Sequence, residues 1–207
     1  MFVDRVQAGE LLGAELARFA DSEPVVLALP RGGVPVAHEV ARVLRAPLDV
    51  LIVRKLGAPE NPEFAFGAVG EGGVVVLDRA SIVGLGIGDV VRDRSIAEAE
   101  SEIDRRVDTY RHGRALTSVA GKTVIVVDDG LATGATAEAA VRVVRALGAR
   151  QVVLAVPTGS RQAIDRLTTM SDAVVCLDSP DWFGSVGGQY EAFPQVSDEE
   201  VEALLHG

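Results

Sequence analysis

The chain has 207 residues, enough for one sizeable hydrophobic core but short for two full domains. Its formal net charge of −10 argues against a nucleic-acid-binding or membrane-surface protein, because both need a basic face. No apolar run approaches the roughly 18 residues that cross a membrane, and Asp4 and Glu10 are not expected in a signal peptide. The one cysteine, Cys176, cannot form an internal disulfide and fits a reducing compartment, so we expect a soluble, cytoplasmic protein.

Short valine-rich runs alternate with longer segments of helical period. An N-terminal segment has helical spacing of its leucines, and the elements expected after it are, in chain order, strand 24–29, helix 34–45, strand 48–53, strand 73–77, helix 89–111, strand 123–127, helix 135–147, strand 151–156, helix 160–169, strand 173–177 and helix 197–205. Strands that are apolar on both faces indicate a mostly parallel sheet flanked by helices, so the predicted fold class is α/β and Rossmann-like. Ligands of such sheets bind at the carboxyl ends of the strands.

The turn after the first predicted strand reads PRGG, residues 30–33. Arg31, at a strand end and beside two glycines, has the charge and the geometry to grip a diphosphate. Pro35 suits the first turn of the helix that follows. An ordinary tight turn explains the same residues.

Residues 53–73 carry the next polar group, Arg54 and Lys55, at the end of a predicted strand. The chain has only two lysines, which makes a lysine at this position unusual. Gly57–Gly73 is rich in glycine and proline and offers little to bury, which predicts a mobile lid. The lid has three acids (Glu60, Glu63 and Glu71) and no basic residue, and a solvated acidic hairpin is the alternative. We expect helix 89–111 to be a highly charged surface or dimer element.

The most informative stretch is VIVVDDGLATGAT, residues 124–136. A predicted strand delivers Asp128 and Asp129 at its carboxyl end, and a helix begins directly after Gly134. The free N–H groups of a helix N-terminus bind anions, and the hydroxyls of Thr133 and Thr136 add donors. Ionised carboxylates pair with hydroxyl groups rather than with a phosphate. A ribose 5-phosphate unit fits both the helix N-terminus and the acid pair, because its diol lies close to its phosphate.

Two other interpretations of the acid pair remain. A response-regulator receiver also has acids after a first strand, but it needs a later lysine, and none follows Lys122. A helix cap explains one acid but not the Thr-Gly-Ala-Thr sequence that follows.

Four apolar residues, two acids, a small residue and then Thr-Gly-Ala-Thr resemble the phosphoribosyl-pyrophosphate (PRPP) motif of type I phosphoribosyltransferases. The resemblance implies that Asp128 and Asp129 hold the ribose hydroxyls. It implies a 5-phosphate cradle of Gly130, Leu131, Ala132, Thr133, Gly134, Ala135 and Thr136. Arg31 and Gly32 match the family's pyrophosphate loop, which often contains a non-proline cis peptide, and we assign further diphosphate charge to Arg54, Lys55 and Mg²⁺.

The resemblance also implies a reaction, the transfer of 5-phosphoribose from PRPP to a nitrogen acceptor, normally a nucleobase, with Mg²⁺ as cofactor. Lys55, Arg31 and Asp129 are the catalytic candidates, with Asp129 or Glu71 as a general base, and Asp128 and Asp129 contribute to metal binding indirectly. In the family a C-terminal hood covers the acceptor, here Trp182 and Phe183. A non-catalytic sensor of PRPP or nucleotides on the same fold is the alternative function.

We expect one phosphoribosyltransferase-like domain over 1–207, with its core at about 20–178 and the hood at about 179–207. The expected partners are PRPP and a small acceptor, without nucleic acid or membrane, and a homodimer is compatible with the long charged helix.

Overall fold

The computed structural model describes residues 1–59 and 61–206. Its elements are α1 (Arg5–Leu16), β1 (Val25–Ala28), α2 (Gly33–Leu44), β2 (Leu48–Val50), β3 (Val53–Ala58), β4 (Asn61–Gly70), β5 (Val74–Leu77), α3 (Arg79–Gly84), α4 (Asp89–Arg111), β6 (Thr123–Val127), α5 (Ala135–Ala146), β7 (Gln151–Thr158), α6 (Arg161–Thr168), β8 (Ala173–Asp178) and α7 (Asp198–His206). Short 3₁₀ helices follow α1 and β4, and a third, Gly187–Gln189, lies in the segment between β8 and α7.

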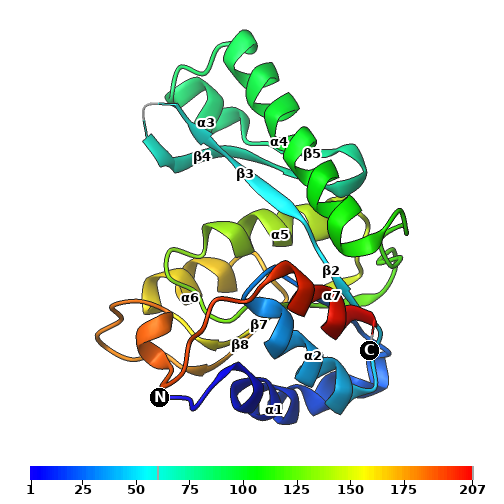
Figure 1. Ribbon diagram of the computed structural model, residues 1–207. Helices are drawn as coiled ribbons and strands as arrows, with labels where there is room; N and C mark the ends of the chain where they lie inside the picture. Colours follow the sequence, from blue (N-terminus) through cyan, green and yellow to red (C-terminus); the bar gives the residue numbers. More distant parts are fainter. Residues whose placement is uncertain (60, 207) are drawn as a thin grey trace.

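The core is a five-stranded sheet in the order β2-β1-β6-β7-β8, and all its neighbouring strands are parallel. This arrangement confirms the α/β fold class. β1 and β6 lie side by side, so the turns that follow them open at the same edge of the sheet. Figure 1 shows α1 and α2 on one side of this sheet and α5 and α6 on the other.

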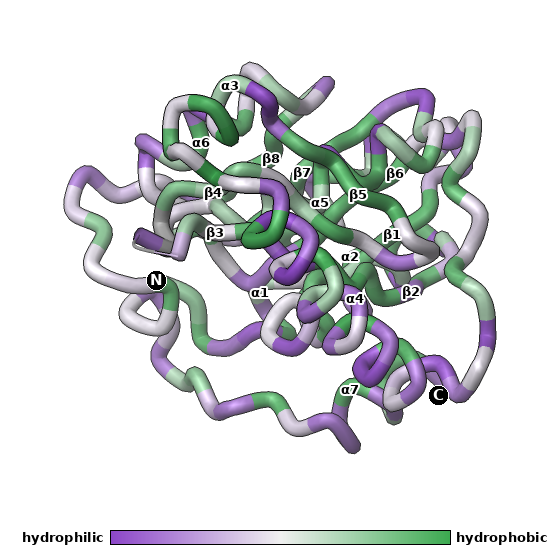
Figure 2. Tube along the Cα trace, turned by 90° about the horizontal axis from the view of Figure 1, so that it is seen from above, coloured by the Kyte–Doolittle hydropathy of each residue, from purple (hydrophilic) through white to green (hydrophobic). Residues whose placement is uncertain are grey.

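Side chains of successive strand residues point to opposite faces, and both faces of this sheet are buried. Val26 and Ala28 join a core cluster with α1, α2 and α7, whereas Val25 and Leu27 join a second cluster with α5 and α6. Valine and isoleucine favour such pleated, enclosed strands. Seen from above in Figure 2, hydrophobic residues follow the strands and hydrophilic ones follow many of the outer loops.

The segment Gly57–Gly73, predicted to be a mobile lid with little to bury, is instead part of a folded sheet. β3, β4 and β5 form a separate antiparallel sheet of three strands, above the main sheet in Figure 1. Its base is buried, since Phe66 and Val69 pack into the core with α4, and Ala68 packs with α5. The predicted strand 73–77 exists, but it pairs with β4 and not with the parallel sheet.

The N-terminal helix α1 was visible only as leucine spacing. Asp4 caps it by accepting a hydrogen bond from the backbone N–H of Gln7 at 2.8 Å. Gly9 and Gly13 let α1 approach α2, because a Cβ on Gly9 would lie 2.7 Å from the carbonyl oxygen of Val36. Within the described part of the chain, every helix is too short or too polar to cross a membrane.

Candidate functional site

The loop after β6 and the first turn of α5 form the centre of the candidate site. Gly134 caps α5 in the left-handed region, with φ of 72°, a conformation that favours glycine. The first N–H groups of a helix have no carbonyl partner within it, and in α5 the N–H of Ala135 donates to Oγ1 of Thr133 at 3.4 Å, a long bond that a ligand oxygen can replace. Thr133 and Thr136 are exposed on either side of this cap. The loop therefore has the donors that an anionic group requires.

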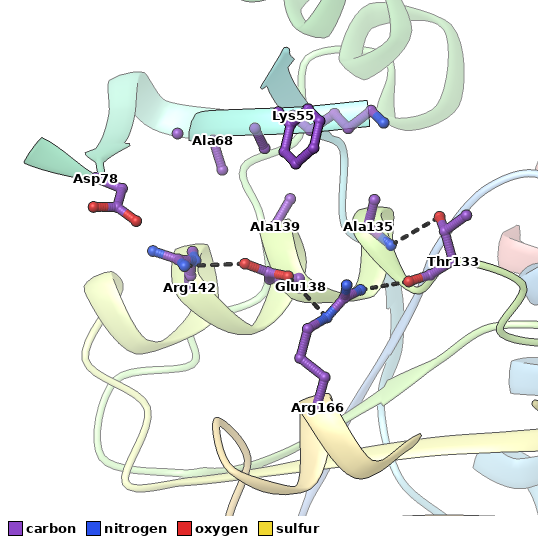
Figure 3. Close-up of a pocket in the computed structure, with 12 residues that line it drawn as sticks. Lys55, Ala68, Asp78, Thr133, Ala135, Glu138, Ala139, Arg142 and Arg166 are labelled. Carbon is purple, nitrogen blue, oxygen red and sulfur yellow. Dashed lines mark hydrogen bonds and ion pairs between the residues drawn. The ribbon is translucent and has the colours of Figure 1, made fainter. Parts of the chain in front are cut away.

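The turn between β7 and α6 fixes the shape of this loop. The backbone N–H of Leu131 donates to the carbonyl of Thr158 at 3.0 Å, and the hydroxyl of Ser160 donates to the carbonyl of Ala132 at 2.7 Å. Figure 3 shows Arg166 reaching from α6 to the carbonyl of Thr133, and beside it Glu138 of α5. The loop is thus held in shape before any ligand binds.

Asp128 and Asp129 follow β6 directly, and the turn after β1 packs against them. A Cβ on Gly32 would lie 2.0 Å from Oδ2 of Asp129, and one on Gly33 would lie 2.9 Å from Cα of Asp128. The peptide bond between Pro30 and Arg31 is cis. It is a non-proline cis bond, because its second residue is Arg31. Residues 30–33 and the acid pair therefore form one continuous surface.

The two acids have different surroundings. Burial and the neighbouring charge of Asp129 raise the pKa of Asp128 well above its usual value. Oδ1 of Asp128 accepts a hydrogen bond from the backbone N–H of Asp129 at 2.9 Å.

Asp129 forms an ion pair that the sequence analysis did not anticipate. Nε and Nη2 of Arg5 lie 2.9 and 2.8 Å from Oδ2 of Asp129, and both side chains are largely buried, at 9 and 14% exposure. The pair joins α1 to the motif, 124 residues away in sequence. Asp129 is therefore not a free carboxylate, and a sugar bound here would share it with Arg5.

Arg5 also holds the C-terminal segment. Its Nη1 donates to the carbonyl of Pro194 at 2.7 Å, and its guanidinium lies 3.7 Å from the centre of the Phe193 ring. The hydroxyl of Tyr190 donates to the carbonyl of Asp129 at 2.6 Å. The N-terminal helix and the segment 190–194 thus both contact Asp129 or its partner Arg5, whereas the C-terminus lies on the opposite side of the molecule in Figure 1.

Arg54 and Lys55, predicted to act together, lie on opposite faces of β3, as neighbours in a strand do. Lys55 lines a cavity of about 210 Å³ with Thr133, Ala135 and Glu138, beside the loop after β6. Nη1 of Arg54 lies 4.0 Å from Glu102 on α4. The two cations therefore serve different regions.

Glu71, one of the two general-base candidates, lies outside the site. It is 5% exposed, accepts the backbone N–H of Ile52 at 2.6 Å and is hydrogen-bonded to the buried Arg111. Burial raises the pKa of Glu71, and Arg111 opposes this shift. The carboxylate is a structural group beneath the β3–β5 sheet. Of the other lid acids, Glu60 and the side chain of Glu63 lie outside the described residues.

Comparison with known proteins identifies the family. Residues 4–191, most of the chain, match the family model of the phosphoribosyl transferase domain. The chain belongs to this family. The resemblance found in the sequence is thus confirmed.

Two relatives are similar over nearly the whole of this phosphoribosyl transferase chain. TT1426 of Thermus thermophilus, a crystal structure, is 48% identical with a TM-score of 0.92, over 99% of this chain and 97% of that one. Rv0571c of Mycobacterium tuberculosis H37Rv, provisionally named a phosphoribosyl transferase, is 49% identical over 205 residues, which are 99% of this chain and 46% of that protein. The chain thus spans about half the length of the curated relatives it matches.

A more distant structure shares the fold alone. AQ2163 of Aquifex aeolicus is 13% identical with a TM-score of 0.53, over 98% of this chain and 85% of that one.

The aromatic residues predicted to contact an acceptor lie in the hood segment after β8. Trp182 is 81% exposed, and its ring packs over Gly184. Contact with the motif comes from Tyr190 and from Val186, whose Cγ1 would lie 2.7 Å from a Cβ on Gly130. No feature of the sequence predicts Tyr190 at the motif, because it lies 61 residues after Asp129 in the chain.

Proposed function

We propose that this chain is a phosphoribosyltransferase that transfers 5-phosphoribose from PRPP to a nitrogen acceptor, normally a nucleobase. One observation carries the proposal: the acid pair and the exposed N-terminus of α5 follow the same strand, beside residues 30–33 at the end of β1. In this proposal the loop Gly130–Thr136 binds the 5-phosphate and Asp128 and Asp129 bind the ribose hydroxyls. Lys55, beside Thr133, adds positive charge to the phosphate side.

The reaction breaks the bond between ribose C1 and a pyrophosphate oxygen and forms a bond from C1 to the acceptor nitrogen. Pyrophosphate leaves with the bonding electrons, and the acceptor loses a proton. Positive charge that develops on the sugar ring is stabilised by the nearby carboxylates, and the protein contributes mainly by positioning the reactants. Arg31 is the group that meets the departing pyrophosphate.

Mg²⁺ fits this site only as a partner of the ligand. Among the described residues, no group of three or more acidic, histidine or cysteine side chains is arranged to hold a metal ion. Oδ2 of Asp129 is already engaged by Arg5. A magnesium ion would therefore take most of its oxygen ligands from the diphosphate, the ribose and water, with Asp128 and Asp129 contributing indirectly, and would neutralise the leaving group.

The test is pyrophosphate release from PRPP and Mg²⁺ with a panel of nucleobases. Asp128→Asn with Asp129→Asn should abolish release and the stabilisation that PRPP gives the wild type. That stabilisation is about 2.7 kcal/mol at 100 times the dissociation constant. An unchanged melting shift in the double variant would contradict the proposed sugar contacts.

A non-catalytic PRPP sensor is the second candidate, and the Arg5–Asp129 ion pair favours it. Arg5 stabilises Asp129 in one position and ties it to the hood, which suits a protein that reports occupancy. The sensor predicts PRPP binding without pyrophosphate release for every acceptor in the panel. The transferase predicts release with at least one of them.

A further inference from the structure

A second cavity lies on the α4 side of the turn after β1. It has a volume of about 280 Å³ and is lined by Pro30, Arg31, Arg105, Arg106, Thr109, Tyr110 and Asp198. Arg31 enters it from the turn, and Arg105 and Arg106 enter it from the last two turns of α4. These residues are far apart in sequence, so packing of α4 against α7, beside the turn after β1, creates the cavity.

Three arginines and one carboxylate, Asp198, line this cavity, and Glu102 and Arg54 lie beside it. Glu102 accepts hydrogen bonds from Arg105 at 3.0 Å and from Arg106 at 2.8 Å. Arg54 approaches the same carboxylate to 4.0 Å. Asp198 lies 3.7 Å from Arg31 and accepts the hydroxyl of Tyr110 at 2.6 Å.

The three lining guanidinium groups exceed the two carboxylates that they contact, Asp198 and Glu102, by one positive charge. In a chain with a net charge of −10, such an excess calls for a local reason. Ion pairs along α4 do not neutralise this charge, because the single carboxylate of Glu102 is shared by Arg105 and Arg106. Arg31 comes from another element and brings its charge to the same cavity.

The cavity is next to the proposed ribose site. Arg31 lines the cavity, and the next residue, Gly32, packs against the carboxylate of Asp129. A group attached to a sugar at Asp129 would therefore lie beside the turn that carries Arg31. Gly57–Gly73, in contrast, contains no basic residue to close over such a group.

We propose that Arg105 and Arg106 of α4, together with Arg31, form the binding site for the diphosphate group of the donor. This inference rests on the proposed function. α4 thereby supplies the positive charge that the segment Gly57–Gly73 lacks. Planar guanidinium groups suit a diphosphate, because each presents two parallel N–H donors to phosphate oxygens.

The test measures binding of inorganic pyrophosphate, of PRPP and of ribose 5-phosphate by calorimetry with Mg²⁺ present. Three proteins are compared: the wild type, Arg105→Gln with Arg106→Gln, and the control Arg94→Gln. Arg94 is a matched control, since it lies on α4, is 80% exposed and pairs only with Glu98 among the described contacts. Glutamine retains helix propensity, and circular dichroism checks that α4 remains folded.

We expect the double variant to bind pyrophosphate and PRPP about tenfold more weakly for each arginine removed, and ribose 5-phosphate as the wild type does. Arg105→Lys with Arg106→Lys should recover part of the loss, because the charge is kept but the paired donors are not. The control should match the wild type.

Pyrophosphate binding that is undetectable in the wild type, or equal in the wild type and the double variant, overturns the inference. Equal losses for ribose 5-phosphate also overturn it, because they indicate general damage to the site. Failure of the proposed function looks different: the wild type then binds pyrophosphate through α4 but releases none from PRPP.

Discussion

Gly32→Ala tests the contact between the turn after β1 and the acid pair. Gly32 has φ of −60°, which alanine adopts freely, so the substitution acts through its added methyl group alone. That methyl carbon would lie 2.0 Å from Oδ2 and 2.7 Å from Cγ of Asp129. Either the turn moves away from β6, or Asp129 rotates and leaves Arg5.

Both responses lower the free energy of unfolding. Overpacking of this kind costs about 1–3 kcal/mol, and loss of a hydrogen bond between charged groups costs about 1.5–3 kcal/mol. Since one response replaces the other, we expect a loss of about 2 kcal/mol. For a chain of this size that lowers the melting temperature by about 4–8 °C.

The assay is thermal unfolding with and without PRPP. Gly32→Ala should melt lower and should bind PRPP at least about tenfold more weakly, since Asp129 is displaced. Gly84→Ala is the control, because no atom lies within 4 Å of its added methyl group and its φ is not positive. A Gly32→Ala protein that melts and binds PRPP like the wild type would refute the packing described here.

Three further outcomes are expected. Arg111→Met leaves Glu71 buried without its cation and should lower the free energy of unfolding in urea by about 3–5 kcal/mol; a loss below about 1 kcal/mol would show that the pair is hydrated. Burial raises the pKa of Cys176 to about 11, so at pH 8 its reactive thiolate is about a hundredfold scarcer than in the unfolded chain. Iodoacetamide should therefore modify Cys176 slowly in the native protein, faster as the pH rises towards 11 and fastest in urea, and equal native and unfolded rates at pH 8 would contradict this. Arg5→Gln should weaken PRPP binding and loosen residues 189–194 in hydrogen exchange, whereas the exposed Arg18→Gln should change neither.

The parallel sheet and the loop after β6 were predictable because their signals are local. β1 and most of β6 and β7 are continuous apolar runs, and the motif places two acids, two glycines and two threonines within nine residues. The helix 89–111 and the strand 123–127 begin and end where the sequence predicted. The sequence did not assign strand 73–77 to its sheet, because its residues alternate between half-buried and exposed and so fit an edge in either sheet.

The contacts of the site were less predictable, because they join segments distant in the chain. Nothing in the sequence around Arg5 distinguishes it from the other arginines, and its pairing with Asp129 depends on how α1 packs. From the sequence, Arg105 and Arg106 likewise belong to a charged surface helix. Only the position of α4 beside the turn at Arg31 shows that they line a cavity. Successive side chains of a strand point to opposite faces. Recognising residues 53–58 as a strand would therefore have placed Arg54 and Lys55 on different faces.

The most direct measurement is a crystal structure of the chain with PRPP and Mg²⁺. We predict the 5-phosphate oxygens within hydrogen-bond distance of the backbone N–H groups of residues 133–136, and the ribose hydroxyls on Asp128 and Asp129. A phosphate bound elsewhere, with Asp129 still held by Arg5 and no sugar hydroxyl on either acid, would contradict the account.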